Sequence, residues 1–324
     1  MRFAGLALVC GVLAASAVPA AAGEWPDRPL TMVYPFTPGS AGDGIGRILA
    51  PRLAELLGRP VLFENVGGAG GMTGALRVAK GEPDGTQFLL GGTFLVINQA
   101  IHRQAPFHAV NDFAPVALLA GQPTVLIGRK DLPANNLPEL IAYTRANRGK
   151  TQYGSAGVGA VTHLSCMLLT SAIGSDAVHV PYRGGGGALQ DLLAGRIDYQ
   201  CPIVNVALPQ IQAGTVKALA ILSKQRSPAL PELASAHEQG LADFDVTNWY
   251  AFFLPKDTPA AIVQKLHAAS AAALETPSVQ EKLKALGAAV TPPAQRTPAY
   301  LKEYVGREIA KWAPVIKAAG AQVD

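Results

Sequence analysis

The order of apolar segments along this chain constrains its fold more than any other feature. Between residues 30 and 90, short apolar runs typical of buried strands (30–34, 61–64 and 86–90) alternate with two segments that carry apolar residues at helical spacing. This β-α-β-α-β order predicts a parallel sheet that is covered by helices. Pro51 lies inside the first helical segment, where we expect a kink, and Gly58 ends that segment.

The same alternation returns in the middle of the chain and predicts a second α/β unit. We expect strands at 116–119, 124–127, 152–154, 178–181, 197–201, 216–222 and 249–254, and helices at 137–147, 163–173 and 189–194. No long Ser- or Gly-rich linker separates the units, which favours two lobes joined by crossing strands, with candidates at 124–128 and 249–254. The predicted division is a first domain of residues 23–125 plus 249–324 and a second domain of residues 126–248.

Composition excludes several classes of protein. The chain has 324 residues, of which 49% are apolar and only 15% are charged, so it can bury a large core and is not intrinsically disordered. Its net charge of +4 is small for this length, and Lys and Arg are scattered along the sequence. A nucleic-acid-binding protein normally shows a basic stripe, so we expect no nucleic-acid partner.

Residues 1–22 read as a secretory signal peptide. Arg2 is followed by an apolar run of about 16 residues and then by Ala20, Ala21 and Ala22, which fit a cleavage site. A membrane-spanning helix is the alternative, but it needs about 20 apolar residues. We therefore expect cleavage after Ala22 and a periplasmic location. The mature chain keeps Cys166 and Cys201; export permits a disulfide, but we expect two buried small apolar side chains.

Two matched glycine-containing loops are the most informative local features. Residues 35–43 (PFTPGSAGD) and 154–163 (GSAGVGAVTH) each follow a predicted strand and precede a predicted helix. Both loops would place free backbone N–H groups at the edge of a sheet where open α/β proteins bind ligands. A helix N-terminus favours anions such as carboxylates. The alternative is two ordinary turns in which Asp43 and Thr162 serve as N-caps.

Sequence signatures of enzymes are incomplete in this chain. Residues 148–151 resemble the end of a phosphate-binding P-loop, but Thr144 stands where the first glycine is required. Residues 68–74 resemble a dinucleotide-binding loop, and residues 153–157 lack the first glycine of a nucleophile elbow. The six histidines show no metal-ligand spacing, and we interpret His163 and His179 as structural. We expect no catalytic residues, no metal and no cofactor.

Eight ordered segments resemble the Bug-type periplasmic solute-binding proteins of tripartite tricarboxylate transporters. The segments are PFTPGSAGD, ENVGGAGGMTG, AKGEPDGTQFLLG, NDFAPVALLA, GSAGVGAVTHL, HVPYRGGGGALQDLLAGRID, PQIQAGTVKALAILSKQRSPALPEL and LPKDTPAAIVQKL. The resemblance implies a type II periplasmic binding protein, or Venus flytrap, with a ligand between two α/β domains. It also implies ligand-binding positions at Phe36, Pro38, Gly39, Ser40, Ala41, Asp43, Thr93, Ser155, Ala156, Gly157, Val158 and Gly159.

Several positions depart from the family pattern or have a second interpretation. Ser40 replaces the second glycine of the usual PGG, Ala160 stands where a serine or threonine is common, and ASAHEQG replaces the usual VPTxxEAG stretch. Arg47 and Arg183 could face a carboxylate, but solvated surface positions are expected. The aromatic residues Phe36, Phe94 and Trp249 could line a pocket for an aromatic acid, although core packing is the simpler expectation.

The functional expectation combines the loops with the resemblance. A small organic acid, such as a di- or tricarboxylate, an aromatic acid or an acidic amino acid, would bridge both lobes and favour their closure. The protein would act as a monomer and deliver this acid to membrane subunits of a transporter. Two alternatives remain open: a sensor that presents its closed form to a signalling receptor, and a periplasmic enzyme that uses Ser155.

Overall fold

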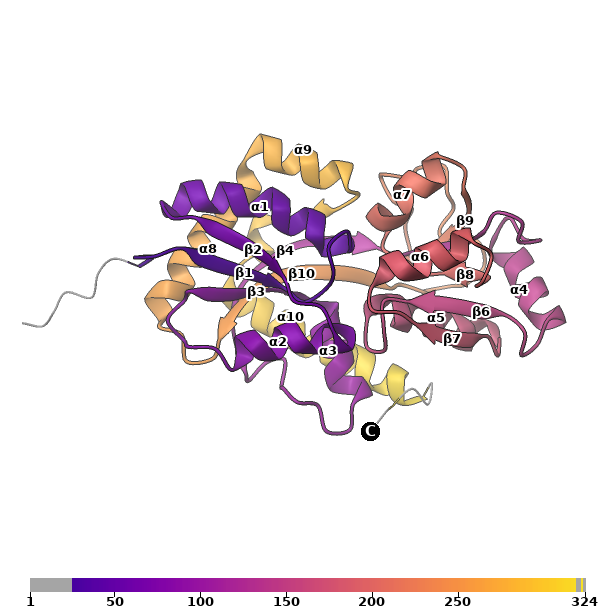
Figure 1. Cartoon of the computed structure of the whole chain (residues 1–324), viewed down its shortest axis with the longest axis horizontal. Coiled ribbons are helices and arrows are strands. Elements are labelled where there is room, and N and C mark those ends of the chain that lie inside the picture. The colour runs from indigo at the N-terminus through magenta and orange to yellow at the C-terminus, as the bar shows by residue number, and fades with distance from the viewer. Residues whose placement is uncertain (1–24, 319–321, 323–324) are drawn as a thin grey trace, which may run out of the picture.

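The computed structural model describes residues 25–318 and 322 and contains two α/β lobes that lie side by side (Figure 1). The first lobe is built on a six-stranded sheet and the second on a five-stranded sheet. The expected signal peptide and its cleavage site lie outside the described residues. Within the described part of the chain, no helix combines the length and the apolar character needed to cross a membrane.

The first sheet has the strand order β11-β4-β10-β3-β1-β2. Strand β1 (Leu30–Tyr34) pairs in parallel with β2 (Val61–Asn65) and with β3 (Gln87–Gly92), as the sequence predicts. Strand β10 (Thr247–Pro255) runs antiparallel to β3 and to β4 (Phe113–Pro123), and β11 (Ala289–Val290) runs antiparallel to β4.

The second sheet has the order β7-β6-β8-β5-β9. Strand β6 (Gln152–Ser155) is parallel to β7 (Val178–Pro181) and to β8 (Tyr199–Gln200), whereas β5 (Val125–Arg129) is antiparallel to β8 and to β9 (Val216–Ile221). The expectation of purely parallel sheets is therefore wrong. In each sheet the strand that arrives from the other lobe, β10 or β5, runs against both of its neighbours.

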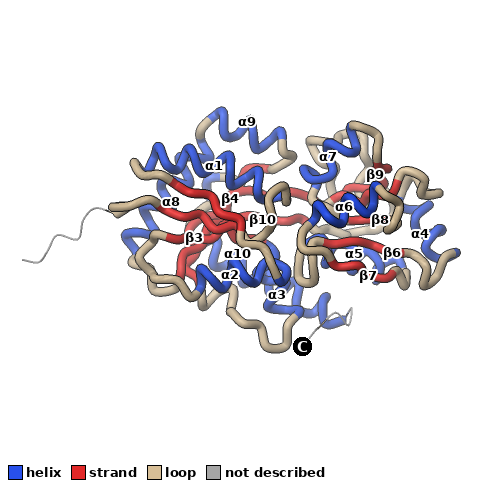
Figure 2. Tube along the Cα trace, viewed as in Figure 1, coloured by secondary structure: helices blue, strands red, loops and turns tan. Residues whose placement is uncertain are grey.

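Helices cover both faces of each sheet (Figures 1 and 2). In the first lobe, one face carries α1 (Ala41–Leu57), α8 (Ala260–Glu275) and α9 (Pro277–Ala285), and the other carries α2 (Met72–Ala79), α3 (Thr93–Ile101) and α10 (Pro298–Ala318). In the second lobe, α6 (Gly185–Leu193) and α7 (Val204–Gln212) lie opposite α4 (Leu137–Ala146) and α5 (Val161–Ile173). Short 3₁₀ turns occupy Ala69–Gly71 and Pro293–Gln295.

Strand β5 shows how the second sheet divides its core. Val125 and Ile127 pack with residues of α6 and α7, whereas Leu126 packs with residues of α4 and α5. This division follows because successive side chains of a strand point to opposite faces. The first lobe buries a larger cluster that includes Leu53, which α1 contributes although Pro51 lies inside that helix.

The chain passes between the lobes at two neighbouring points. Thr124 separates β4 from β5, and both its N–H and its Oγ1 donate to the carbonyl oxygen of Val246, at 3.4 Å and 3.0 Å. Val125 pairs in the second sheet and Asn248 pairs in the first, so the chain passes between the lobes just before each of these residues. The two crossing segments lie side by side and connect the lobes.

Cys166 and Cys201 form a disulfide, with their Cα atoms 5.5 Å apart. The expectation of two unlinked apolar side chains is therefore wrong. Cys166 lies on α5 and Cys201 follows β8, and both are fully buried in the core of the second lobe. The bond ties α5 to the segment that leads into α7.

Candidate ligand-binding site

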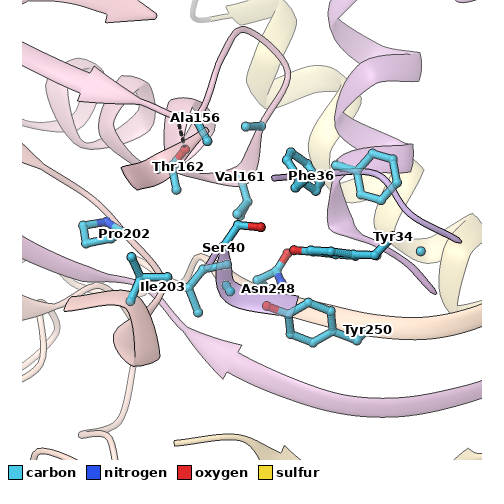
Figure 3. A pocket seen from close by; sticks show the side chains of 17 residues that line it. Tyr34, Phe36, Ser40, Ala156, Val161, Thr162, Pro202, Ile203, Asn248 and Tyr250 are labelled. Carbon is cyan, nitrogen blue, oxygen red and sulfur yellow. Dashed lines mark hydrogen bonds between the residues drawn. The ribbon is translucent and has the colours of Figure 1, made fainter. Parts of the chain in front are cut away.

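A cavity between the two lobes encloses about 560 Å³ of space that no protein atom occupies, its open mouth included. We call this space the interlobe cavity. It is lined by residues of both lobes (Figure 3): Tyr34, Phe36, Ser40, Ala41, Gly91, Gly92, Phe94, Ala156, Ala160, Val161, Thr162, Gly185, Pro202, Ile203, Val206, Asn248 and Tyr250.

Five helices begin at this cavity. Each of α1, α3, α5, α6 and α7 contributes a lining residue from its N-cap or first turn. None of their N-cap side chains caps its own helix, whereas the Asn136 side chain caps α4, which begins at the outer end of the second lobe (Figure 1). Helix N-termini carry partial positive charge and unpaired donors, so the cavity favours an anion.

The N-termini of α1 and α5 approach the same space from opposite lobes. Figure 3 shows Ser40, at the start of α1, and Val161, at the start of α5, beside the centre of the cavity. Among the residues that the structure describes, the N–H groups of Ala41, Val161 and Thr162 have no hydrogen-bond acceptor. These donors can therefore bind an anion that touches both lobes.

Asp43 stabilises the first loop through hydrogen bonds of its carboxylate and does not cap α1. Ser40 is the N-cap residue, so the expectation that Asp43 holds this position is wrong. The Asp43 carboxylate accepts hydrogen bonds from the Gly39 N–H, from Arg47 Nε and from Asn65 Nδ2, at 3.2, 3.0 and 3.0 Å. Burial raises the pKa of this carboxyl, but the hydrogen bonds from Arg47, Gly39 and Asn65 outweigh burial and lower the pKa overall.

The second loop is held by two hydroxyl groups. Ala156 N–H donates to Thr162 Oγ1 at 2.9 Å, and Gly157 N–H donates to Ser155 Oγ at 3.1 Å. Thr162 is not the N-cap residue that the alternative interpretation of this loop required, because Ala160 occupies that position. The hydroxyl of Thr162 instead accepts the hydrogen bond from Ala156 and so holds the start of the loop in place.

A pair of histidines supports the same loop. His179 Nε2 lies 2.7 Å from Ser155 Oγ, and the ring of His179 stacks on His163 with centroids 4.2 Å apart. Burial lowers the pKa of both imidazoles to about 4, so both are neutral near pH 7. Their place behind the loop agrees with the interpretation of both as structural residues.

The structure separates the twelve residues implied by the resemblance into three groups. Phe36, Ser40, Ala41 and Ala156 line the interlobe cavity. Gly157 and Val158, together with Phe36 and Ala156, line a neighbouring cavity against the glycine loop 67–71. The other six, which line neither cavity, are Pro38, Gly39, Asp43, Thr93, Ser155 and Gly159.

Thr93 and Trp249 do not line the interlobe cavity and form hydrogen bonds away from it. The Oγ1 atom of Thr93 accepts a hydrogen bond from the Trp249 N–H at 2.9 Å, and the indole of Trp249 donates to Glu308 Oε2 at 3.1 Å. Trp249 therefore belongs to the core, whereas Phe94 and Phe36 form an edge-to-face pair that lines the cavity. The guanidinium of Arg47 is held by Asp43, and Arg183 lines the neighbouring cavity.

Sequence reasoning missed a group of lining residues on strand β10 and before α7. Asn248 and Tyr250 come from β10, and Pro202, Ile203 and Val206 come from the start of α7. Tyr34 ends β1 and was missed as well. No Lys, Arg, Asp or Glu is among the lining residues, so the backbone dipoles of the helix N-termini are the groups there that can favour an anion. Within the described residues, no cluster of three His, Cys, Asp or Glu side chains is arranged to hold a metal.

The two lobes contact each other along a seam formed by Gly70 and Asn98 of the first lobe and Val158 and Gly159 of the second. The glycines on both sides of this seam allow the two backbones to approach closely. A Cβ atom on Gly70 would lie 2.0 Å from the carbonyl oxygen of Val158, and one on Gly159 would lie 2.2 Å from Asn98 Oδ1. The side chain of Asn205, in the second lobe, donates from Nδ2 to the carbonyl oxygen of Ala41 at 2.8 Å. The lobes are thus closed on each other around the cavity.

Two α/β lobes, two segments that cross between them and a cavity at their junction define a two-lobed ligand-binding protein. The TctC family, described as the tripartite tricarboxylate transporter family receptor, matches residues 45–321. The chain belongs to this family of periplasmic solute-binding proteins, which confirms the resemblance seen in the sequence.

Relatives of known structure have the same architecture. The periplasmic binding protein BugD is 35% identical, with a TM-score of 0.88 over 92% of this chain and 99% of that one. MatC from Rhodopseudomonas palustris, solved with bound malate, is 37% identical, with a TM-score of 0.87 over 90% of this chain and 100% of that one. A UPF0065 protein of the TAR-I ttuE–ttuC′ intergenic region of Agrobacterium vitis is 37% identical over 92% of this chain and 86% of that protein.

Proposed function

We propose that this protein captures a small carboxylate-bearing solute in the interlobe cavity and delivers it to the membrane subunits of a tripartite tricarboxylate-type transporter. The observation that carries the proposal is the convergence of five helix N-termini, without side-chain caps, on a cavity that has no charged side chain. Malate bound to MatC supports a carboxylate as the ligand class. Family membership supports the transporter as the partner and the periplasm as the location.

Capture follows from the position of the donors. The N–H of Ala41 belongs to the first lobe, and those of Val161 and Thr162 belong to the second. A carboxylate that accepts from both lobes binds the closed form more tightly than the open form and shifts the population toward closure. The closed form then presents a surface that differs from the open one, which is what a membrane subunit can distinguish.

We infer binding without turnover. Ser155, the residue that the enzyme alternative would use, is fully buried, does not line the interlobe cavity, and accepts a hydrogen bond from the Gly157 N–H. An acid incubated with the protein is therefore expected to be recovered unchanged.

We also infer that the protein acts as a monomer. Among the described residues, the large apolar side chains that are exposed are Leu62, Val178 and Leu193, and they lie on three different elements, β2, β7 and α6. Light scattering of the mature chain is expected to give the mass of one chain.

A thermal-shift screen tests the proposed function. The screen contains dicarboxylates, tricarboxylates, aromatic acids and acidic amino acids, with neutral sugars as controls. A ligand at 100 times its Kd stabilises the folded state by about 2.7 kcal/mol, which raises the melting temperature measurably. At least one acid is expected to do so. If only sugars or other uncharged compounds raise the melting temperature, the proposed function is wrong.

A further inference from the structure

The hydroxyl of Tyr250 is a buried polar group that has no partner in good hydrogen-bond geometry among the described residues, although the side chain of Asn248 lies close enough to lower its pKa against the larger effect of burial. Tyr250 is only 3% exposed, and its hydroxyl is fully enclosed although the residue lines the interlobe cavity (Figure 3). A buried hydroxyl that binds nothing costs about 1–3 kcal/mol. Such a group beside a cavity needs a partner, which a bound molecule that enters the cavity can supply.

The position of Tyr250 is fixed by the sheet. In the first sheet, Tyr250 pairs with Gly92 of β3 on one side and with Ala120 of β4 on the other. Asn248 lies two residues earlier on the same strand and therefore points to the same face of the sheet. Both side chains line the cavity from its floor, on the strand that crosses to the second lobe.

The neighbouring hydroxyl of Tyr34 is already engaged. It accepts a hydrogen bond of 2.8 Å from the Gly42 N–H, in the first turn of α1. Burial raises the pKa of Tyr34 to about 12 and raises that of Tyr250 well above its usual value, so both phenols keep their protons. This floor of the cavity is therefore uncharged, and Tyr250 offers a donor.

We propose that Tyr250 and Asn248 form a second subsite that binds a hydroxyl or carbonyl oxygen of the ligand, while the carboxylate binds at the helix N-termini. The inference rests on the proposed function, because it assumes an acid in the interlobe cavity. A hydroxyl suits the pair well, since it can accept from Tyr250 and donate to the amide oxygen of Asn248. A site that hydrogen-bonds a substrate hydroxyl discriminates against the analogue that lacks it.

Matched ligand pairs test the subsite. The pairs differ by one hydroxyl: malate and succinate, citrate and tricarballylate, 3-hydroxybenzoate and benzoate. Titration calorimetry on the wild-type chain is expected to show that, within the pair that binds, the hydroxylated acid has a Kd about tenfold lower. Tyr250→Phe, which removes only the hydroxyl, is expected to reduce this preference to less than about twofold.

Controls separate the subsite from folding and from the proposed function. Tyr300→Phe, on α10 and outside the cavity, is expected to keep the preference. If Tyr250→Phe does not fold, as judged by circular dichroism, Asn248→Ala provides the same test. Equal binding of both acids by the wild type, or an unchanged preference in the variant, overturns the subsite and leaves the proposed function standing. Binding of no acid by the folded wild type overturns both.

Discussion

Asn205 in the second lobe donates a hydrogen bond from Nδ2 to the carbonyl oxygen of Ala41, 2.8 Å away, at the first residue of α1. The bond joins the start of one ligand-facing helix to that of another, because Asn205 lies in the first turn of α7. Asn205 does not line the interlobe cavity, so it contributes to closure without touching a ligand.

The first prediction concerns this bond. Asn205→Ala removes one hydrogen bond of the closed form only, which is worth about 1 kcal/mol, or roughly a fivefold loss of ligand affinity. Titration calorimetry with the acid found in the screen measures the change. Asn147→Ala is the control, because the Asn147 side chain bonds Tyr143 within the second lobe. Unchanged affinity in Asn205→Ala would show that the bond does not govern closure.

The second prediction concerns the glycine seam. Gly159 and Gly195 have similar left-handed backbones, with φ of +80° and +71°. A Cβ on Gly159 would lie 2.2 Å from Asn98 Oδ1, across the seam, whereas one on Gly195 would meet nothing within 4 Å. Alanine at either position strains the backbone by roughly 1–2 kcal/mol, but only Gly159→Ala also wedges the lobes apart.

Both variants are therefore expected to melt at similarly reduced temperatures. Gly159→Ala is expected to lose more than about tenfold in affinity for the acid, which corresponds to about 1.4 kcal/mol, while Gly195→Ala binds like the wild type. Equal affinities in the two variants would contradict the wedge. Small-angle scattering without ligand adds an independent readout, since the wedged protein is expected to be more extended.

The third prediction concerns the disulfide between Cys166 and Cys201. The bond closes a loop with a sequence separation of 35 residues. The chain-entropy relation gives about 3–4 kcal/mol of stabilisation for a loop of this length. Reduction under mild denaturation is expected to lower the melting temperature by about 10 °C. The double variant Cys166→Ala, Cys201→Ala is expected to melt at the lower temperature with or without reductant. If reduction of the disulfide is verified and the melting temperature of the wild type does not fall, the prediction is wrong.

The fourth prediction concerns the neutral histidine pair. Burial lowers the pKa of His163 and of His179 from 6.5 to about 4. Between these values the unfolded chain binds more protons than the folded one, so stability is complete above about pH 6.5 and falls as the pH drops toward about 4. Urea unfolding at several pH values measures this slope.

Substitution of His163 isolates its contribution. His163→Phe keeps a ring against His179 but removes one titrating group, and it is expected to flatten the fall in stability between about pH 6.5 and 4. Asn147→Ala, which removes no titrating group from the same lobe, is expected to leave the slope unchanged. A slope that persists in full in His163→Phe would assign the acid sensitivity to other groups.

Local patterns in the sequence predict much of this architecture. The strand Leu30–Tyr34 and the helix end at Gly58 follow from apolar runs and a glycine whose φ is +69°. The two glycine loops are also visible in the sequence, because each lies between a strand and a helix. Their role in the cavity follows from the general rule for sheet edges rather than from any single residue.

What the sequence cannot show depends on tertiary register. Tyr250 lies within an apolar strand whose burial is almost complete, so nothing in its neighbours indicates which face meets the cavity. Cys166 and Cys201 belong to different elements, and only the packing of α5 against the sheet brings them together. Asp43 and Thr162 have the residue types of N-caps, but each lies inside the first turn and bonds the loop before its helix.

The central claim is that backbone donors at helix N-termini bind a carboxylate in the interlobe cavity. Titration calorimetry with an acid from the screen and with the amide of the same acid tests this claim most directly, because the two ligands differ in charge and hardly in shape. The acid is expected to bind at least about thirtyfold more tightly, a difference of about 2 kcal/mol. An amide that binds as tightly as its acid would contradict the account.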